Sequence, residues 1–226
     1  MDQRKYYEAY DERYKIAHSR NIRWMSDRHS AIVSEVIEKY RIGKDMPILE
    51  LGCGEGRDAQ VLLENGYNLL ATDISPEGIR YCKERCPDHA DRFRILDCVL
   101  GSLDGKFDFI YAVAVIHMLL LDEDRDKCYR FVREHLTHDG IGLICTMGDG
   151  NTERRSDIST AFELQERECN GQTVWVTGTS CRMVSFQTFT EELVRNHLEI
   201  VERGITCVEP DFPKMMYAVV RKGIDP

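Results

Sequence analysis

A glycine-rich turn between an apolar strand and a helix constrains this chain more than any other feature. Residues 48–51 predict a buried strand that contains one acidic residue, Glu50. The turn that follows has glycine at positions 52, 54 and 56, and a helical pattern begins at Arg57. Glycine lets the backbone approach a ligand closely at the carboxyl edge of a parallel sheet. The turn therefore predicts an α/β protein that binds a nucleotide-like ligand at this edge.

Short apolar strands alternate with helical patterns from Pro47 to about Met147. Strands that alternate with helices form βαβ units, which give a parallel sheet with helices on both faces. Two later strands bring the expected sheet to seven strands, mostly parallel, with the last strand reversed. The expected strands cover residues 48–51, 67–72, 93–96, 107–113, 141–147, 198–206 and 214–221.

Capping signals mark the ends of the expected helices. Gly66 stands where a left-handed C-cap would end the helix over 57–65. Ser75 and Pro76 are typical of an N-cap followed by a first-turn proline. Asp122 is expected to cap a helix over 123–136, and the capping-box pattern from Thr188 to Glu191 is expected to open a helix that ends near His197.

Two segments outside the alternation are expected to be additions to a single domain over residues 1–226. Residues 1–41 repeat apolar side chains, Met25 among them, at three- and four-residue steps, so they predict a helical N-terminal cap. Residues 149–186 predict an inserted ribbon or lid, because Asn170-Gly171 is a strong hairpin signal. No repeat or linker divides the chain.

Composition excludes several classes of function. The chain has 30 Lys and Arg against 39 Asp and Glu, a net charge of -9, and no basic block, so we expect no nucleic acid or anionic membrane as a partner. Its longest apolar stretch, residues 111–121, is about half of the roughly 20 residues that a membrane span needs. The first residues lack the apolar core of a secretory signal. We therefore expect a cytoplasmic protein.

Nine cysteines occur without the spacing of a disulfide framework. Cys82, Cys86 and His89 come nearest to a metal cluster. However, the two cysteines stand four residues apart, which is typical of the inward stripe of a helix. We expect the cysteines to be buried apolar side chains and expect no metal site.

The acidic residue and glycines of the first turn, Glu50, Gly52, Gly54 and Gly56, form a pattern that resembles motif I of the class I S-adenosylmethionine-dependent methyltransferases. Later signals follow in the order of that family. The second strand ends at Asp73 and the third at Asp97-Cys98. Residues 107–117 are similar to motif IV, and residues 136–140 occupy a turn that the family often writes as Leu-Lys-Pro-Gly-Gly. The resemblance covers residues 47–147, and the small-molecule branch that includes the tellurite-resistance methyltransferases is similar.

The resemblance implies a Rossmann-like fold, S-adenosylmethionine as cofactor, S-adenosylhomocysteine as product, and in-line SN2 transfer of a methyl group to a small molecule. In the family, the carboxylate that ends the second strand binds both ribose hydroxyls, and the residues that end the third strand bind the adenine. The residues that we expect to bind the cofactor are Glu50, Gly52, Cys53, Gly54, Gly56, Arg57, Asp73, Ile74, Asp97, Cys98, Ala112 and Tyr10.

The chemistry of these positions is consistent with those roles. One carboxylate at Asp73 can accept charge-assisted bonds from two hydroxyls. The side chain of Asp97 and the backbone N–H of Cys98 can together satisfy the amine and ring acceptor of an adenine. Structural alternatives stay open: Asp73 can cap the next helix, Glu50 can hold the turn, and Asp97 can be an ordinary residue at a strand end.

His117 follows the fourth strand, where the acceptor approaches the methyl group in the family. A neutral imidazole there can take the acceptor's proton, so His117 is the candidate general base; the alternative is a packed histidine or polar cap. We expect the acceptor pocket to be shared by His117, the N-terminal segment and the inserted ribbon. The N-terminal residues that could close over the pocket, or simply pack a helix, are Tyr6, Tyr10, Tyr14, Arg23 and Trp24.

Two other functions compete with a methyltransferase. A nucleotide-dependent oxidoreductase would use the same kind of sheet, but the dinucleotide fingerprint requires glycine at the sixth position from Gly52, where this chain has Arg57. A non-catalytic module could keep the cofactor site and lack an acceptor pocket. The sequence names neither the acceptor, nor the atom that is methylated, nor the oligomeric state.

Overall fold

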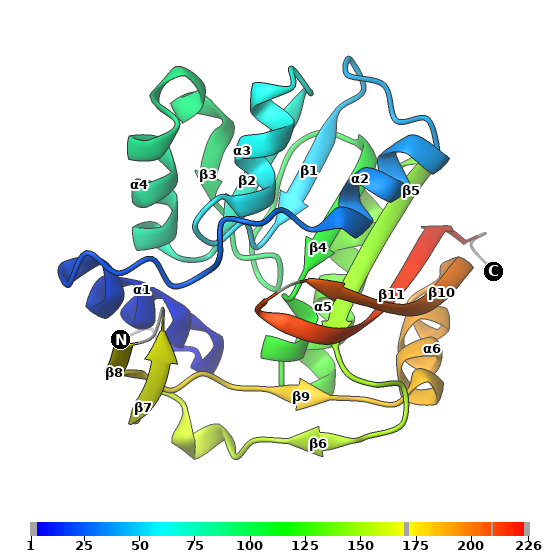
Figure 1. Cartoon of the computed structure of the whole chain (residues 1–226). Helices are drawn as coiled ribbons and strands as arrows, with labels where there is room; N and C mark the ends of the chain where they lie inside the picture. Colours follow the sequence, from blue (N-terminus) through cyan, green and yellow to red (C-terminus); the bar gives the residue numbers. More distant parts are fainter. Residues whose placement is uncertain (1–3, 170–171, 209, 224–226) are drawn as a thin grey trace.

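A seven-stranded sheet forms the centre of the computed structural model, which describes residues 4–169, 172–208 and 210–223 (Figure 1). The strand order is β10-β11-β5-β4-β1-β2-β3. Strands β1 to β5 pair in parallel, and β11 pairs antiparallel with both β5 and β10. The mostly parallel sheet with a reversed last strand is thus confirmed. The strands are β1 (Ile48–Leu51), β2 (Leu69–Asp73), β3 (Phe93–Ile95), β4 (Phe107–Val113), β5 (Leu136–Met147), β10 (Leu198–Val208) and β11 (Phe212–Lys222).

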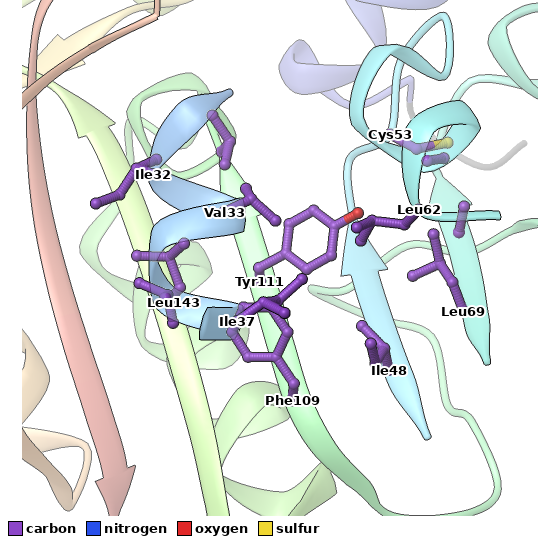
Figure 2. Close-up of a cluster of buried hydrophobic side chains, with 14 of the residues drawn as sticks. Ile32, Val33, Ile37, Ile48, Cys53, Leu62, Leu69, Phe109, Tyr111 and Leu143 are labelled. Atoms are coloured by element: carbon purple, nitrogen blue, oxygen red, sulfur yellow. The ribbon is translucent and has the colours of Figure 1, made fainter. Parts of the chain in front are cut away.

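Helices cover both faces of this sheet. Helices α2 (Ala31–Lys39), α3 (Arg57–Glu64) and α4 (Pro76–Arg85) pack on one face, and α5 (Asp122–His135) and α6 (Phe186–Arg195) pack on the other. Figure 2 shows apolar side chains of α2 pointing onto β4 and β5, beside Tyr111. Such burial of apolar surface on both faces accounts for the continuous apolar sequence of the central strands.

The predicted helix ends are partly confirmed. Gly66 has φ +82° after α3, and the Ser75 hydroxyl accepts a hydrogen bond from Gly78 N, as an N-cap should. Two other predicted starts are wrong. Asp122 lies inside α5, with Leu121 at the N-cap. Helix α6 begins at Phe186, because the side chain of Ser185 accepts the bond from Thr188 N and caps the helix one turn earlier.

The N-terminal segment contains less helix than the sequence pattern indicates. A short 3-10 helix (Tyr6–Glu8) leads into α1 (Ala9–Ser19), and the chain then runs without a helix to α2. Met25 lies in this non-helical stretch. Figure 1 shows α1 lying across the carboxyl edge of the sheet, near β7 and β8. We call residues 4–30 the arm.

The segment after β5 forms two small antiparallel pairs. Strand β6 (Arg154–Arg155) pairs with β9 (Arg182–Met183), and β7 (Leu164–Cys169) pairs with β8 (Gln172–Thr177). Asn170 and Gly171, which carry the hairpin signal, lie outside the described residues. Val174 and Val176 of β8 pack against Ile16, Ile22 and Trp24. The ribbon, by which we mean β6 to β9, therefore touches the arm.

Cys82 has a packing role. Its thiol lies 3.3 Å from the carbonyl oxygen of Gly54, to which it donates, so the residue joins α4 to the glycine-rich turn. Across the part of the chain that the structure describes, no group of three or more His, Cys, Asp or Glu side chains is placed to hold a metal ion. Among the same residues, no helix is both long and apolar enough to cross a membrane.

Candidate active site

A pocket lies at the carboxyl ends of β1, β2 and β4, beneath the arm. Most of the predicted cofactor residues line it: Glu50, Gly52, Cys53, Gly54, Arg57, Asp73, Ile74, Asp97, Cys98 and Tyr10. The other three predicted residues, Gly56, Ala112 and His117, are not among the described residues that line it. We call the strand ends and their loops the floor of the pocket, and the arm and ribbon its cover.

The glycine-rich turn has a backbone that glycine adopts most readily. Gly52, Gly54 and Gly56 have φ values of +73°, +55° and +78°. A Cβ atom at Gly54 would lie 2.7 Å from the hydroxyl of Tyr14, and one at Gly52 would collide with Val115. Glycine is therefore favoured at all three positions by the turn, and at Gly54 also by the close approach of the arm.

Asp73 is buried at the end of β2, and backbone N–H groups hold its carboxylate. Oδ2 accepts from Gly54 N at 2.8 Å, and Oδ1 accepts from Ser75 N at 2.8 Å. Burial raises the pKa of Asp73 above its usual value, although these two bonds oppose the shift. Each carboxylate oxygen can accept more than one bond. Asp73 thus shapes the turn and keeps acceptor capacity for a ligand.

Asp97 lies two residues after β3, the strand that pairs with β2, so it stands on the same side of the floor as Asp73. Its Oδ1 accepts from Val99 N at 2.8 Å, which fixes the carboxylate in its loop. Its Oδ2 faces the arm, where Lys5 Nζ lies at 3.0 Å and the Tyr7 hydroxyl at 3.3 Å. The arm and the floor therefore meet at a carboxylate that lines the pocket.

Two further ionisable side chains of the floor each have a buried polar atom without a hydrogen-bond partner among the described residues. These atoms are Oε2 of Glu50 and Nε of Arg57. Burial raises the pKa of Glu50 well above its usual value. Arg57 donates through Nη2 to the Ser30 hydroxyl at 2.9 Å. Both residues line the pocket, so its lining contains a carboxyl group and a guanidinium group.

The arm covers the floor through aromatic side chains and one helix cap. Tyr7, Tyr10 and Tyr14 line the pocket. Asp11 accepts from the Ser75 hydroxyl at 2.7 Å and from Glu77 N at 3.0 Å, so it caps the start of α4. These contacts hold α1 directly above Asp73.

Arg13 joins the arm to the ribbon. The side chain is buried, and its Nε donates to the carbonyl oxygen of Thr177 at 2.8 Å. The guanidinium carbon lies 4.9 Å from the ring centroid of Tyr10 and 4.7 Å from that of Trp24. The two parts of the cover therefore contact one another as well as the floor.

His117 packs behind the pocket wall. It lies in a short 3-10 helix (Ile116–Met118), is 3% exposed, and contacts the ring of Phe212, which lines the pocket. Burial, together with the charge of Arg125, lowers the pKa of His117 to about 4. The imidazole is therefore neutral near pH 7. Its role as a general base stays a prediction.

Side chains from α5 and from the ribbon segment hold the loop that follows β4. The carbonyl oxygen of Ile116 accepts from Arg125 at 2.7 Å, that of Met118 accepts from Ser180 at 2.6 Å, and that of Leu120 accepts from Arg182 at 2.8 Å. Ser180 and Arg182 come from the ribbon segment. Because Met118 and Leu119 line the pocket, the ribbon acts on the pocket wall through this loop.

Sequence reasoning missed several residues of the pocket. Phe212 begins the last strand, and Met25 had been assigned to a helix face. No local pattern marks either residue as part of a site. The same holds for Tyr7, which lines the pocket, and for Lys5, which bonds to Asp97. Their places depend on how the arm and the β10–β11 turn fold back over the floor.

Comparisons with known proteins agree with the geometry. Residues 49–141 match the family model described as a methyltransferase domain. The chain is 29% identical over 85 residues to the O-antigen chain terminator bifunctional methyltransferase/kinase WbdD of Escherichia coli. The aligned segment covers 35% of this chain and 12% of that protein. It is 26% identical over 117 residues to the probable S-adenosyl-L-methionine-dependent methyltransferase TehB of Haemophilus influenzae. That aligned segment covers 51% of this chain and 41% of that protein.

The fold is also that of a solved methyltransferase. An S-adenosylmethionine-dependent methyltransferase from Clostridium acetobutylicum superposes with a TM-score of 0.67 at 17% identity, over 93% of this chain and 96% of that one. This likeness concerns the fold. The chain spans less than half the length of WbdD or TehB. The matched segment is thus similar to a methyltransferase domain, and the predicted resemblance to the class I S-adenosylmethionine-dependent enzymes is confirmed.

Proposed function

We propose that this chain, whose central segment is an S-adenosylmethionine-dependent methyltransferase domain, transfers a methyl group from S-adenosylmethionine to a small-molecule acceptor by in-line displacement. The observation that carries this proposal is the placement of polar groups in the pocket. Asp73 and Asp97 lie on the floor at one end, and the unpartnered atoms of Glu50 and Arg57 belong to the same lining. S-adenosylmethionine has a nucleoside at one end and an amino-acid group at the other.

The nucleoside fits the two aspartates. The two ribose hydroxyls are donors, and Asp73 keeps acceptor capacity beyond its bonds to Gly54 and Ser75. The exocyclic amine of adenine is also a donor, and Oδ2 of Asp97 faces the pocket with only side-chain partners from the arm. Cys98 lines the adjacent wall, where its backbone can meet the ring acceptor.

The amino-acid group fits the other polar atoms. Its ammonium can donate to Oε2 of Glu50, and its carboxylate can accept from Nε of Arg57. Buried polar atoms without partners carry a free-energy cost that a ligand of matching chemistry removes. The charges therefore suit a zwitterion better than a phosphate, for which a pocket with several carboxylates is unsuitable.

When bound, S-adenosylmethionine supplies an electrophilic methyl group on its sulfonium. The chain's own contribution is to hold that group and the acceptor in line and to exclude water. Val115, Met118, Leu119 and Phe212 provide apolar walls, and the tyrosines of the arm cover the pocket. Well-oriented intramolecular reactions gain roughly 7 to 11 kcal/mol from such positioning. No covalent intermediate with the protein is needed.

The remaining features of the proposal concern the acceptor and the whole chain. A pocket covered by the arm, which the ribbon contacts through Arg13, suits a small molecule, and a net charge of -9 opposes a nucleic acid partner. We take residues 1–226 to act as one domain in the cytoplasm, with residues 1–41 as an N-terminal cap and residues 149–186 as an inserted ribbon or lid.

His117 is proposed as the general base for an acceptor that must lose a proton. Its imidazole is neutral at pH 7 and contacts Phe212, which lines the pocket, so the role requires the acceptor to reach past Phe212 and the pKa of about 4 to rise when the acceptor binds. We expect His117→Gln to lower turnover of a weakly acidic acceptor by roughly 10²-fold, the lower end for acid–base catalysis, with little change in cofactor affinity. Equal turnover by both proteins across acceptors of different pKa would rule out this role.

The proposed function is tested by turnover. The protein is incubated with S-adenosylmethionine and a fractionated metabolite extract, and S-adenosylhomocysteine is measured by mass spectrometry. We expect product above the level formed by Asp73→Ala. Cofactor binding without product in any fraction would instead indicate the non-catalytic binding module.

A further inference from the structure

His18, the penultimate residue of α1, bridges two carboxylates. Its Nε2 lies 2.8 Å from Oε1 of Glu55, and its Nδ1 lies 2.7 Å from Oε1 of Glu77. The side chain is 6% exposed. The imidazole stacks with two tyrosine rings, Tyr81 at 4.3 Å and Tyr14 at 5.8 Å between centroids. The bridge is therefore buried and its geometry is fixed on several sides.

Both hydrogen bonds can form at once only if the ring is charged. A neutral imidazole has one donor and one acceptor nitrogen, whereas ionised carboxylates only accept. Burial lowers the pKa of His18, but the bonds to Glu55 and Glu77 outweigh it, so the pKa is raised above the ordinary value of 6.5. The structure therefore favours an imidazolium.

The groups around the bridge supply further hydrogen-bond donors to both carboxylates. Glu77 also pairs with Arg80 at 2.6 Å, and this pair, together with His18, lowers the pKa of Glu77. Glu55 also accepts from the backbone N–H groups of Trp24 and Met25 at 2.9 and 2.7 Å. The other titratable or charged groups that face the bridge are Asp11, Tyr14 and Arg23 of the arm and Tyr81 of α4.

Glu55 places this bridge at the cofactor site. It stands between Gly54 and Gly56 in the glycine-rich turn, and Gly54 N holds Asp73. Its bonds to the backbone fix Met25, which lines the pocket. On the other side of the bridge, α1 carries Tyr10 and Tyr14 into the pocket. His18 thus connects the cover to the part of the floor that approaches the ligand most closely.

We propose that His18 is a positioning residue whose imidazolium holds the arm closed on the glycine-rich turn, so that the protein retains S-adenosylmethionine more tightly when His18 is protonated. This inference rests on the proposed cofactor. The coupling requires that the ligand binds with the arm closed. Loss of the proton then removes one of the two charge-assisted bonds that close it.

The test is calorimetric titration of the full chain with S-adenosylhomocysteine between pH 6 and 9. We expect wild-type affinity to fall by roughly tenfold as the pH rises through the pKa of His18, the factor that one unit of coupled pKa shift gives. His18→Gln cannot titrate, so its affinity should be lower at pH 6 and nearly independent of pH. Glu77→Gln removes one carboxylate from the bridge, which lowers the pKa of His18. The affinity of this variant should therefore fall at a lower pH than that of the wild type.

His29→Gln is the matched control, because His29 is exposed and belongs to the same arm. It should keep the wild-type pH profile. The His18 ring proton, followed by NMR, should titrate above pH 6.5. A midpoint at or below 6.5, or parallel profiles for wild type and His18→Gln, would overturn the proposal. Absence of S-adenosylhomocysteine binding by the wild type at every pH would instead refute the proposed function, and the positioning role with it.

Discussion

The floor and the cover of the pocket are held by different kinds of interaction. On the floor, Asp73 accepts bonds from backbone N–H groups, one of them only two residues along the chain. In the cover, side chains bond to partners far away in the sequence: Lys5 to Asp97, Arg13 to Thr177 and His18 to Glu55. Bonds between neighbouring loops at the edge of a packed sheet are held in place by the sheet, whereas a few side-chain bonds between distant segments can open locally. The difference indicates a fixed floor under a cover that can move.

Two buried histidines illustrate the same contrast. His117, behind the floor, has no carboxylate partner among the described residues, and burial lowers its pKa to about 4. His18, in the cover, is bonded to two carboxylates, and its pKa is raised. The ring without a carboxylate partner is therefore neutral, and the ring between two carboxylates favours the charged form, because the partners decide which form is stable.

Removal of the cover should have the largest effect. Deletion of residues 1–20 takes away the tyrosines that line the pocket and the bonds to Asp97 and Glu55, while the sheet and its helices remain. We expect turnover to fall by about 10²-fold, the loss typical of misplaced reactants, and melting temperature to change less in proportion. Steady-state assays and thermal unfolding measure the two effects. A truncated protein with full activity would show that the arm only packs.

Loss of one floor carboxylate should come next. Asp73→Ala removes the proposed acceptor for both ribose hydroxyls, so cofactor binding should weaken by about 1.5 to 3 kcal/mol, the range for hydrogen bonds to a charged group. Calorimetry with S-adenosylhomocysteine measures it. Asp108→Ala is the matched control, because Asp108 lies near the opposite end of β4 and accepts from Thr137. If the folded Asp73→Ala and Asp108→Ala proteins bind S-adenosylhomocysteine with equal affinity, Asp73 does not belong to the cofactor site.

The buried histidine of the floor predicts a loss of stability in acid. The pKa of His117 is lowered from 6.5 to about 4, so the unfolded chain binds its proton first as the pH falls. The stability from the neutral ring is fully present above pH 6.5 and is lost progressively towards pH 4, by at most about 2 kcal/mol at pH 5. Urea unfolding of wild type and His117→Gln at pH 7 and pH 5 measures this difference. Identical pH dependence would contradict it.

The smallest effect concerns the contact between floor and cover at Gly54. Gly54→Ala and Gly66→Ala both place an alanine at positive φ, which costs roughly 1 to 2 kcal/mol of unfolding free energy in each protein. Only the Gly54 variant also meets Tyr14, since a Cβ at Gly66 has no atom within 4 Å. We therefore expect a loss of S-adenosylhomocysteine affinity for Gly54→Ala alone. Addition of Tyr14→Phe to Gly54→Ala should restore part of this affinity. If affinity is not restored, the contact between Gly54 and Tyr14 does not contribute to binding.

The floor could be predicted from the sequence because its determinants are local. A strand, three alternate glycines and a helix follow one another within residues 48–64, and the backbone of the turn allows few alternatives. Asp73 and Asp97 stand at or just beyond strand ends, and parallel topology brings those ends to one edge. Ser75 was placed correctly as a cap for the same reason, since its partner is three residues away.

The cover could not be predicted in the same way. Lys5, Arg13 and His18 look like ordinary polar residues of a helical segment, and their partners are 37 to 164 positions away. His117 was chosen from its position after β4, but whether a side chain enters a pocket or packs behind it depends on Phe212, which arrives from the last strand. Such tertiary contacts leave no periodic pattern in the chain.

The central claim is that the floor binds S-adenosylmethionine and not a dinucleotide. Parallel calorimetric titrations of the wild-type protein at pH 7 with S-adenosylmethionine and with NADH test it directly. The account predicts saturable one-to-one binding of S-adenosylmethionine and no measurable heat from NADH. Binding of NADH in place of S-adenosylmethionine would contradict the account and favour a nucleotide-dependent oxidoreductase.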